Sequence, residues 1–345
     1  MRYFVFTAFT ALVVFFSCSA AYFLYSLKSV AVESDNLPLV KIKIERGDGL
    51  REISAVLSQN RLIRSVSVFK TYALISGLAH RLKPGVYELS SSLSTPEIMA
   101  EIVAGRATGI SLIIPEGATV KEIDRILASA GILKEGELVN FWQPDFLKSY
   151  PFQIPEAGQP EAGRPWAGLE GFVFPDTYKF SFGSSPVDVM KKFLDTFETK
   201  AWPLLKSDND WYASLIKASM LEKEIPDFGD RRVVSGIIEK RLKNEVPLQI
   251  DATLVYDKCQ GDFLSCREVL LAKSDFGESS PYNTYKSLGL PPTPISNPGE
   301  SAIKAALDPQ TSPYWYYLSD RKTKKTYFSK TLDEHNNYRA KYLNL

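Results

Sequence analysis

Two carboxylates lie close together in the segment Ser-Met-Leu-Glu-Lys-Glu-Ile-Pro at 219–226. On a helix Glu222 and Glu224 would point about 200° apart, so they do not face one cleft together. The paired-carboxylate geometry of glycoside cleavage is therefore not supplied by these two side chains alone. Pro226 predicts that the helix ends near Ile225. Glu224 then lies in the last turn, where the helix macrodipole raises the pKa of a carboxyl group, as a general acid requires. The competing interpretation is an exposed helix end without chemistry.

A second polar cluster lies in the segment Val-Pro-Leu-Gln-Ile-Asp-Ala-Thr-Leu-Val-Tyr at 246–256. Its alternation predicts a strand around 248–256, on which Gln249 and Asp251 share one face. An amide beside a carboxylate suits hydrogen bonding to sugar hydroxyls. A solvent-facing strand edge would show the same pattern, so the spacing alone leaves both interpretations open.

Aromatic and amide side chains follow in segment 280–299, whose five prolines and two glycines predict a rigid irregular loop. Tyr282, Asn283 and Tyr285 in this loop suit carbohydrate binding. A packed loop that closes a hydrophobic core would have the same composition, and this alternative also stays open.

The composition excludes several kinds of site. The chain has only two histidines, His80 and His335, and neither has a cysteine or carboxylate beside it at metal-ligand spacing. We therefore expect no metal centre, and the absence of P-loop, dinucleotide and Gly-x-Ser-x-Gly motifs gives no cofactor either. His335 and Asn336 fall on an expected C-terminal helix, where a lone histidine is more often structural. With 41 basic against 40 acidic residues, no nucleic acid is expected as a partner.

Residues 3–26 form an uncharged apolar run between Arg2 and Lys28. About 20 such residues cross a hydrocarbon core roughly 30 Å thick. The apolar part of a cleaved signal peptide is only about 7–15 residues long. We therefore expect an uncleaved single-pass anchor over residues 1–28, with everything after Lys28 on one side of the membrane.

The mixed helix and strand periods that follow predict an α+β protein. A polar tether at 29–40 precedes a small α/β domain at 41–110, with the order strand, helix, helix, strand, helix. A second strand–helix region and a Pro- and Gly-rich linker occupy 111–168. The larger α+β domain is expected at 169–345. Its first helices are expected at 186–205, 209–225 and 231–243.

Segments 44–63 and 114–133 resemble one another as a strand, a glycine turn and an amphipathic helix. Such units recur in LysM-like glycan-binding modules, which suggests a LysM-like domain at 41–110. A small packing domain of another kind fits the same pattern.

Six motifs, with the anchor and the LysM-like region before them, resemble those of the membrane-anchored endolytic peptidoglycan transglycosylases, the YceG-like or MltG family. In this chain they are LEGFVFPDTY at 169–178, ASMLEKE at 218–224, DRRVVSGIIEKRL at 230–242, LQIDATLVY at 248–256, YNTYKSLGLPPTPISNPG at 282–299 and YFSKTLDEHN at 327–336. Their order and spacing cover most of the chain, which makes the resemblance specific.

The resemblance implies an endolytic lytic transglycosylase that cleaves nascent peptidoglycan between N-acetylmuramic acid and N-acetylglucosamine. The product has a 1,6-anhydro end, and the cleavage limits glycan strand length. The family's catalytic glutamate corresponds to Glu224, which would protonate the leaving oxygen and then take the proton of the C6 hydroxyl. Because that hydroxyl is the nucleophile, no second carboxylate is needed, and Glu222 is expected to have a supporting role.

The same resemblance places the protein in the bacterial cytoplasmic (inner) membrane, with its catalytic domain on the extracytoplasmic or periplasmic side. Peptidoglycan strands are the expected partner, and cell-wall synthases are candidates. It also assigns residues to substrate binding. These are Phe174, Asp176, Glu222, Gln249, Asp251, Tyr282, Asn283, Thr284, His335 and Asn336.

Some features depart from the family pattern. Lys240, Ile250 and Ala252 stand where other residue types are frequent, at positions that flank the expected strand. Cys259 and Cys266 lie in an insertion-like segment, and an extracytoplasmic compartment would allow them to form a disulfide.

Two rival functions stay open. One is a non-catalytic peptidoglycan-binding scaffold of the cell-wall synthesis machinery. The other is a hydrolase that releases reducing ends, for which Asp251 is the obvious second carboxylate.

Overall fold

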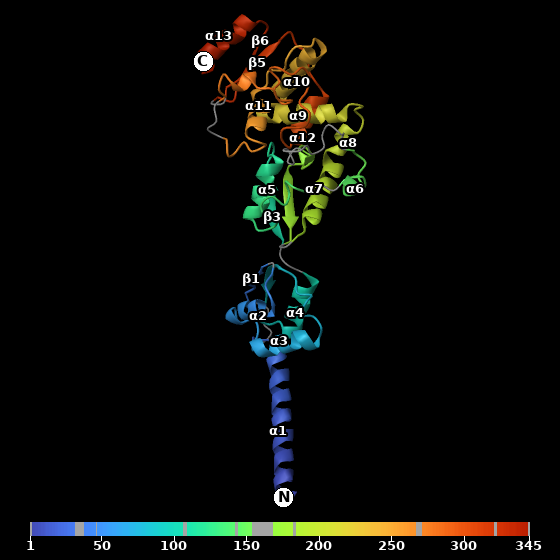
Figure 1. The fold of residues 1–345 in the computed structure, drawn as a ribbon, viewed down its shortest axis with the longest axis vertical. Helices are drawn as coiled ribbons and strands as arrows, with labels where there is room; N and C mark the ends of the chain where they lie inside the picture. The colour runs from blue at the N-terminus through green and yellow to red at the C-terminus, as the bar shows by residue number, and fades with distance from the viewer. Residues whose placement is uncertain are drawn as a thin grey trace. The chain divides into compact units, whose positions relative to one another are not determined.

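The computed structural model describes residues 2–31, 38–45, 47–105, 109–141, 144–153, 168–181, 184–266, 271–320 and 323–343. The chain divides into two compact units, each described by itself below (Figure 1). The first unit comprises residues 1–111 with 179–184, and the second comprises residues 112–178 with 185–345. The sequence left open where the segment after 111 packs, and its described residues belong to the second unit.

Helix α1 (Arg2–Leu27) begins the first unit. Its stretch Phe9–Leu27 has a mean hydropathy of 1.7 and is 6% buried, so it is long and apolar enough to span a membrane. Large side chains such as Phe15 and Phe16 stay exposed along it. The apolar run of the sequence is therefore one continuous helix with an uncovered apolar surface, which is consistent with a single-pass anchor.

The rest of the first unit has the expected order of elements. They are β1 (Val40–Ile44), α2 (Leu50–Gln59), α3 (Val66–Ile75), β2 (Gly85–Leu89) and α4 (Thr95–Ala104). Strands β1 and β2 pair antiparallel, with Ile42 opposite Tyr87. The buried side chains of Ile44, Leu57 and Phe69 join them in one core. The α+β character is confirmed, whereas the likeness to a LysM module remains a prediction.

The two segments that resemble one another in sequence also share their local structure. Strand β3 (Ile110–Ile114) and helix α5 (Val120–Ser129) have the same spacing as β1 and α2. Each helix is followed by a residue in the left-handed conformation, Arg61 with a φ of 55° and Gly131 with a φ of 70°. The similarity in sequence therefore reflects a repeated strand–turn–helix unit, with glycine at the left-handed position of one copy and arginine in the other.

The remaining described elements are mostly helices, with a few short strands among them. They are α6 (Pro144–Leu147), β4 (Asp176–Phe180), α7 (Pro186–Lys200), α8 (Trp202–Leu205), α9 (Trp211–Glu224), α10 (Phe228–Lys243), α11 (Asp251–Lys258), the 3-10 turn η3 (Asp275–Gly277), α12 (Glu300–Leu307), β5 (Tyr316–Ser319), β6 (Thr326–Ser329) and α13 (Leu332–Leu343). Strand β3 pairs with β4, and β5 pairs antiparallel with β6. The three helical regions expected after residue 185 are confirmed as α7 with α8, α9 and α10.

Helix α9 lies at the centre of the second unit and contacts α10, α11 and α12 (Figure 1). Apolar side chains on several sides of it, including Leu215, Met220 and Leu221, are fully buried. Beside its first turn, Phe172 packs with Phe197 at a ring-centroid distance of 5.1 Å. A helix buried all round holds its ends in fixed positions, and Glu224 is the last residue of this one.

The strand expected around 248–256 is wrong, because residues 251–258 form α11. Ile250, just before the helix, is extended, whereas the backbone of Gln249 adopts a left-handed φ of 55°. The Gln249 N–H donates to the Thr284 carbonyl, and the Ile250 N–H donates to the Thr284 hydroxyl oxygen. Contacts with a segment more than 30 residues away end the extended chain, and alternation in the sequence does not reveal them.

Helix α10 packs closely on the segment before β5 at Gly236, and a substitution there tests this packing. A Cβ atom at this position would lie 2.1 Å from the Gln310 carbonyl oxygen, which is backbone and has little freedom to move. Gly236→Ala should therefore lower the free energy of unfolding by about 1–3 kcal/mol, although alanine ordinarily stabilises a helix. A thermal melt should show a midpoint several degrees lower. Gly277→Ala is the control, because a Cβ there meets nothing within 4 Å; an unchanged midpoint for Gly236→Ala would contradict the packing.

Candidate functional site

Glu224 lies where one helix ends and another begins. It is the last residue of α9 and is partly buried, and its Oε1 accepts a hydrogen bond of 3.3 Å from the Ala252 N–H in the first turn of α11. The end of α9 disfavours a carboxylate, whereas the start of α11 favours one. Only the first effect can be predicted from the sequence, because the second comes from a helix 27 residues further along the chain. The structure therefore places two opposed helix termini at the same carboxyl group.

Asp251 is the first residue of α11 and is exposed. Its Oδ1 accepts a hydrogen bond of 2.5 Å from the Tyr285 hydroxyl. Burial raises the pKa of Tyr285, and the nearby charges of Asp251 and Glu224 raise it further, so this hydroxyl remains a donor. Glu224 and Asp251 thus both lie near the Tyr285 hydroxyl, whereas Glu222 and Glu224 have different partners.

Strand β5 brings Tyr317 to the same place. Burial raises the pKa of Tyr317 well above its usual value, with Glu224 as the next cause and Asp251 as a smaller one. The buried Arg241 guanidinium opposes this rise. Arg241 donates to the carbonyls of Trp315 and Leu248 at 3.0 and 2.7 Å. Arg241 therefore links the start of β5 to the chain before α11, close to Glu224.

The C-terminal helix contributes His335, whose ring stacks on Tyr316 with centroids 5.4 Å apart. Burial lowers the pKa of His335, and the positive charges of Arg339 and Arg241 lower it further. Its Nδ1 is buried without a hydrogen-bond partner among the described residues. Asn336 is exposed on the same helix. The structure thus brings His335 close to Arg241 and Tyr316. Its role in substrate binding remains a prediction.

The three loop residues predicted to bind substrate directly precede Tyr285, and their side chains are buried. Tyr282 is 2% exposed, and its hydroxyl bonds with that of Thr293 at 2.7 Å. The buried Asn283 amide donates to the Glu278 carbonyl at 2.8 Å and accepts from the Tyr285 N–H at 3.0 Å. Thr284 is buried against the chain that leads into α11. In this structure these three side chains shape the loop that presents Tyr285.

Gln249 is exposed at the start of α11, beside Asp251. Phe174 and Asp176 lie instead at the beginning of β4, where Phe174 is buried and Asp176 forms an ion pair of 2.5 Å with Lys200. Lys200 lowers the pKa of the Asp176 carboxyl group. The assignment of Phe174 and Asp176 to the substrate remains a prediction.

Glu222 lies on the buried side of α9. It forms an ion pair of 2.6 Å with Arg231, and both side chains are 6% exposed. Its second oxygen accepts from the Gly299 N–H at 3.0 Å. Burial raises the pKa of Glu222, and the Arg231 charge opposes the rise. These contacts fix the last turn of α9 to α10 and α12, in line with a supporting role.

Lys223 extends this buried charge network. Its Nζ lies 3.8 Å from the centroid of the Phe263 ring. Burial lowers the pKa of Lys223, whereas the carboxylates of Glu122, Glu170 and Glu222 act to raise it. The network therefore surrounds the residue that directly precedes Glu224.

Glu170, in the motif LEGFVFPDTY, is a residue of this region that the sequence did not predict. It is fully buried and accepts hydrogen bonds of 2.9–3.0 Å from the Val120 N–H, the Asn297 amide and the Tyr256 hydroxyl. Burial raises the pKa of Glu170 to about 8. A carboxyl group with partners from three separate segments is a strong positioning device. The sequence indicates this buried carboxyl group only by an acidic residue within the otherwise uncharged segment LEGFVF.

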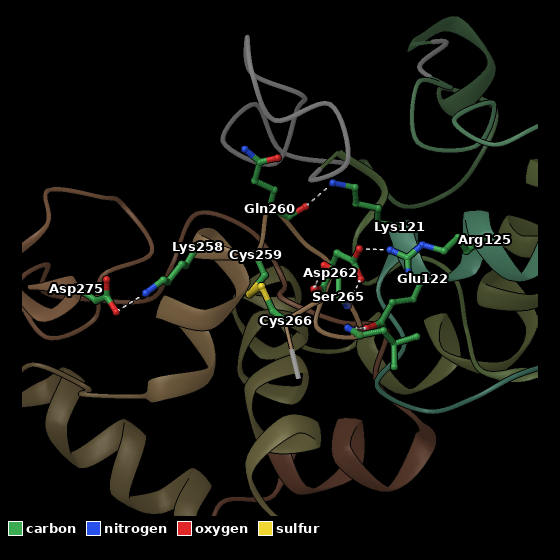
Figure 2. The surroundings of a disulfide bond; sticks show 11 residues. Lys121, Glu122, Arg125, Lys258, Cys259, Gln260, Asp262, Ser265, Cys266 and Asp275 are labelled. Atoms are coloured by element: carbon green, nitrogen blue, oxygen red, sulfur yellow. Dashed lines mark hydrogen bonds and ion pairs between the residues drawn. A yellow bond between two sulfur atoms is a disulfide. The ribbon is translucent and has the colours of Figure 1, made fainter. Parts of the chain in front are cut away.

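Cys259 and Cys266 form the disulfide that the sequence left as a hypothesis. The bridge closes a loop directly after α11, and Lys258 forms an ion pair of 2.6 Å with Asp275 beside it (Figure 2). The compact loop is thus attached to the end of α11 opposite Asp251.

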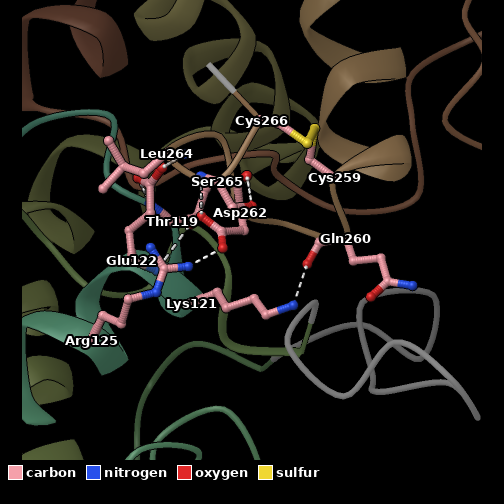
Figure 3. A network of polar contacts seen from close by, with 10 residues as sticks. All are labelled: Thr119, Lys121, Glu122, Arg125, Cys259, Gln260, Asp262, Leu264, Ser265 and Cys266. Carbon is pink, nitrogen blue, oxygen red and sulfur yellow. Dashed lines mark hydrogen bonds and ion pairs between the residues drawn. A yellow bond between two sulfur atoms is a disulfide. The ribbon is translucent and has the colours of Figure 1, made fainter. Parts of the chain in front are cut away.

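The disulfide loop is also bound to α5. Asp262 pairs with Arg125, and the Leu264 N–H donates to Glu122 at 3.0 Å (Figure 3). The other Glu122 oxygen accepts from the Thr119 N–H at 3.1 Å and caps α5. Through these contacts α5 fixes the loop that follows α11, as Glu170 fixes the middle of α11 through Tyr256.

In the part of the chain that the structure describes, neither a metal centre nor the larger of two cavities coincides with this site. Within the described ranges, no three His, Cys, Asp or Glu side chains gather as metal ligands. A cavity of about 640 Å³, lined by Asp208, Lys217 and Glu239, contains none of the predicted site residues.

Glu170 predicts a pH dependence of stability. The folded protein holds the proton of this carboxyl up to about pH 8, whereas an unfolded chain releases it near its usual pKa of 4.5. The free energy of unfolding should therefore fall as pH rises between these values. Glu170→Gln keeps two acceptor contacts and should flatten this part of the pH profile in thermal melts. Glu135→Gln, at an exposed position, is the control; a profile that Glu170→Gln leaves unchanged would contradict the prediction.

The comparisons with known proteins agree with the motifs. The model of the YceG-like family matches residues 42–341. A protein of Bacillus subtilis named endolytic murein transglycosylase is 30% identical over 322 residues, which cover 90% of this chain and 87% of that protein. A Streptococcus pneumoniae protein of the same name is 26% identical and matches 91% of this chain over 60% of its own length.

A crystal structure of a YceG-like protein from Listeria monocytogenes matches with a TM-score of 0.57 and 31% identity. The match covers 88% of this chain and 99% of that one. The family match covers the first unit from residue 42 onward and the second unit up to residue 341. The chain therefore belongs to the YceG-like family.

Proposed function

We propose that this protein is a membrane-anchored endolytic lytic transglycosylase of peptidoglycan, with Glu224 as its one catalytic acid and base. The observation that supports this most directly is the position of Glu224, partly buried between the end of α9 and the Ala252 N–H. The names of the relatives from Bacillus and Streptococcus point to the same reaction.

The proposed reaction uses one carboxyl group twice. Protonated Glu224 donates its proton to the glycosidic oxygen, and the bond from C1 of N-acetylmuramic acid to that oxygen breaks. The resulting carboxylate then takes the proton of the C6 hydroxyl, and O6 bonds to C1 as the 1,6-anhydro ring closes. Glu224 ends protonated and no water is consumed. The Ala252 N–H stabilises the carboxylate between the two steps.

Asp251 would bind the sugar in this scheme. It is exposed beside Gln249, and the Tyr285 hydroxyl fixes its orientation. A fixed carboxylate next to the forming positive charge at C1 lowers the energy of an oxocarbenium-like transition state. Gln249, His335 and Asn336 are proposed as further contacts along the glycan, and Glu222 as a support of α9.

The hydrolase alternative has a specific observation in its favour. The charges of Asp251 and Glu224 both raise the pKa of Tyr285, so the Asp251 carboxylate lies in the neighbourhood of Glu224. Hydrolysis would leave reducing ends, whereas transglycosylation leaves anhydro ends. The scaffold alternative predicts binding without either product.

Anchoring by α1 would hold the second unit on one side of the cytoplasmic membrane, which we propose to be the extracytoplasmic side. A disulfide between Cys259 and Cys266 fits that compartment, since cytosolic thiols stay reduced. There the enzyme would meet nascent strands and limit their length, with cell-wall synthases as neighbours.

Glu224→Gln tests the reaction and the residue together. The full chain in detergent should release anhydro-muramoyl fragments from purified peptidoglycan, as read by mass spectrometry. The variant should lose at least 100-fold in rate, because an amide cannot transfer the proton. Glu278→Gln, at an exposed position, should keep the native rate. Reducing ends from the native protein would mean a hydrolase, and binding without product would mean a scaffold.

Tyr285→Phe tests the orientation of Asp251. Loss of a hydrogen bond to a charged group should lower kcat/KM about tenfold while the product stays the same. Tyr282→Phe is the matched control, because its hydroxyl bonds to Thr293 inside the loop. That variant should lower stability more than activity. Equal losses of activity in both variants would show that only the loop's integrity matters.

A further inference from the structure

A small cavity lies where α1 meets the folded part of the first unit. Its volume is about 380 Å³, within the range of small-ligand sites. Tyr22, Tyr25 and Ser26 line it from the last turns of α1, and Ser58, Arg61 and Arg64 line it from the opposite side. The lining thus includes two guanidinium groups and several hydroxyls, and no carboxylate.

Arg64 is fixed in this cavity. It donates to the carbonyls of Ser29 and Val30 at 2.9 and 3.1 Å and to the Tyr25 hydroxyl at 3.0 Å. Its guanidinium also lies 4.7 Å from the centroid of the Tyr25 ring. These three bonds use three of the five N–H groups of an arginine. Two N–H groups and the full positive charge of Arg64 remain for a ligand, on a guanidinium that is already oriented.

Arg61 is unusual in a different way. It is exposed, and its φ of 55° is a conformation that favours glycine. The equivalent position of the repeated strand–turn–helix unit is Gly131. A side chain at this position carries a conformational cost of order 1 kcal/mol, which points to a role for the side chain itself.

The cavity also lies at the end of the apolar stretch Phe9–Leu27. Tyrosines at the end of a membrane helix are typical of the lipid headgroup level. Two guanidiniums and hydroxyl donors at that level match the phosphate of a lipid, which arginine binds through paired N–H groups.

We propose that this cavity is a binding site for the phosphate headgroup of an anionic phospholipid, with Arg61 and Arg64 as its cationic ligands. The site rests on the insertion of α1 in a bilayer, which belongs to the proposed function. It would fix the height and orientation of the first unit at the membrane surface, because Arg64 also ties the chain after α1 to the segment before α3.

The test uses the full chain in a neutral detergent and native mass spectrometry. Dioleoylphosphatidylglycerol is titrated against dioleoylphosphatidylcholine, and inorganic phosphate serves as the free anion. Arg61→Gly restores the residue that the repeated unit has, so it should fold at least as well as the native chain. Arg61→Lys keeps the charge, and Arg51→Gln removes an exposed charge of α2 that does not line the cavity.

The native chain should bind phosphatidylglycerol at least fivefold more tightly than phosphatidylcholine. Arg61→Gly should lose about fivefold in affinity, and Arg61→Lys and Arg51→Gln should lose less than twofold. Equal affinity for the two lipids, or an equal loss in Arg51→Gln, would overturn the site. Displacement of the lipid by millimolar phosphate would show a free-anion site and overturn the lipid assignment.

Flotation with phosphatidylcholine vesicles separates the two proposals. A chain that floats without a preference for phosphatidylglycerol has an inserted helix and no headgroup site. A chain that does not float has neither.

Discussion

The geometry around Glu224 depends on a buried hydrogen-bond network centred on Glu170 and Asn297. Asn297 accepts from the Val173 N–H and donates to the Ala118 carbonyl and to Glu170. Glu170 in turn binds the start of α5 and, through Tyr256, α11. Each member is satisfied, and in a low-dielectric interior such a network admits one arrangement of its segments. Four stretches that are distant in the sequence are thereby fixed relative to one another.

Helix α9 is tied to the same network at several levels. The Ser219 hydroxyl accepts from the Ile295 N–H, and its carbonyl accepts from Ser296. One turn later Glu222 binds Arg231 and the Gly299 N–H. A glutamate at the end of a helix is ordinarily mobile, because final turns fray. Here the preceding turn is held on two sides, so Glu224 has a defined position.

The two ends of α11 are used in different ways. Its N-terminus faces Glu224 and presents Asp251, while its C-terminus leads into the disulfide loop that α5 holds. The axis of this short helix is therefore fixed at the end remote from the carboxylates. A small shift of α11 would change the Ala252 contact and the Asp251–Tyr285 bond together, which makes the distant loop relevant to the geometry of the site.

The sequence by itself determined the apolar helix, the order of elements in the first unit, α7 to α10, and the family through its motifs. These depend on local periodicity, on turn and cap residues, and on residue identity at fixed spacing. The cysteine pairing was foreseen as a hypothesis, because the two residues are close in the chain and the structure has the bond.

The tertiary structure decided what lies beside Glu224. Helix α11 replaced the expected strand because Thr284, far along the chain, ends the extended segment. Tyr317 and Arg241 reach the site from β5 and α10, and Glu170 acts from a buried position behind it. Contacts between distant segments leave no periodic trace in a sequence. The motifs therefore singled out Glu224 as the proposed catalytic carboxylate, and only the packed fold showed which groups lie around it.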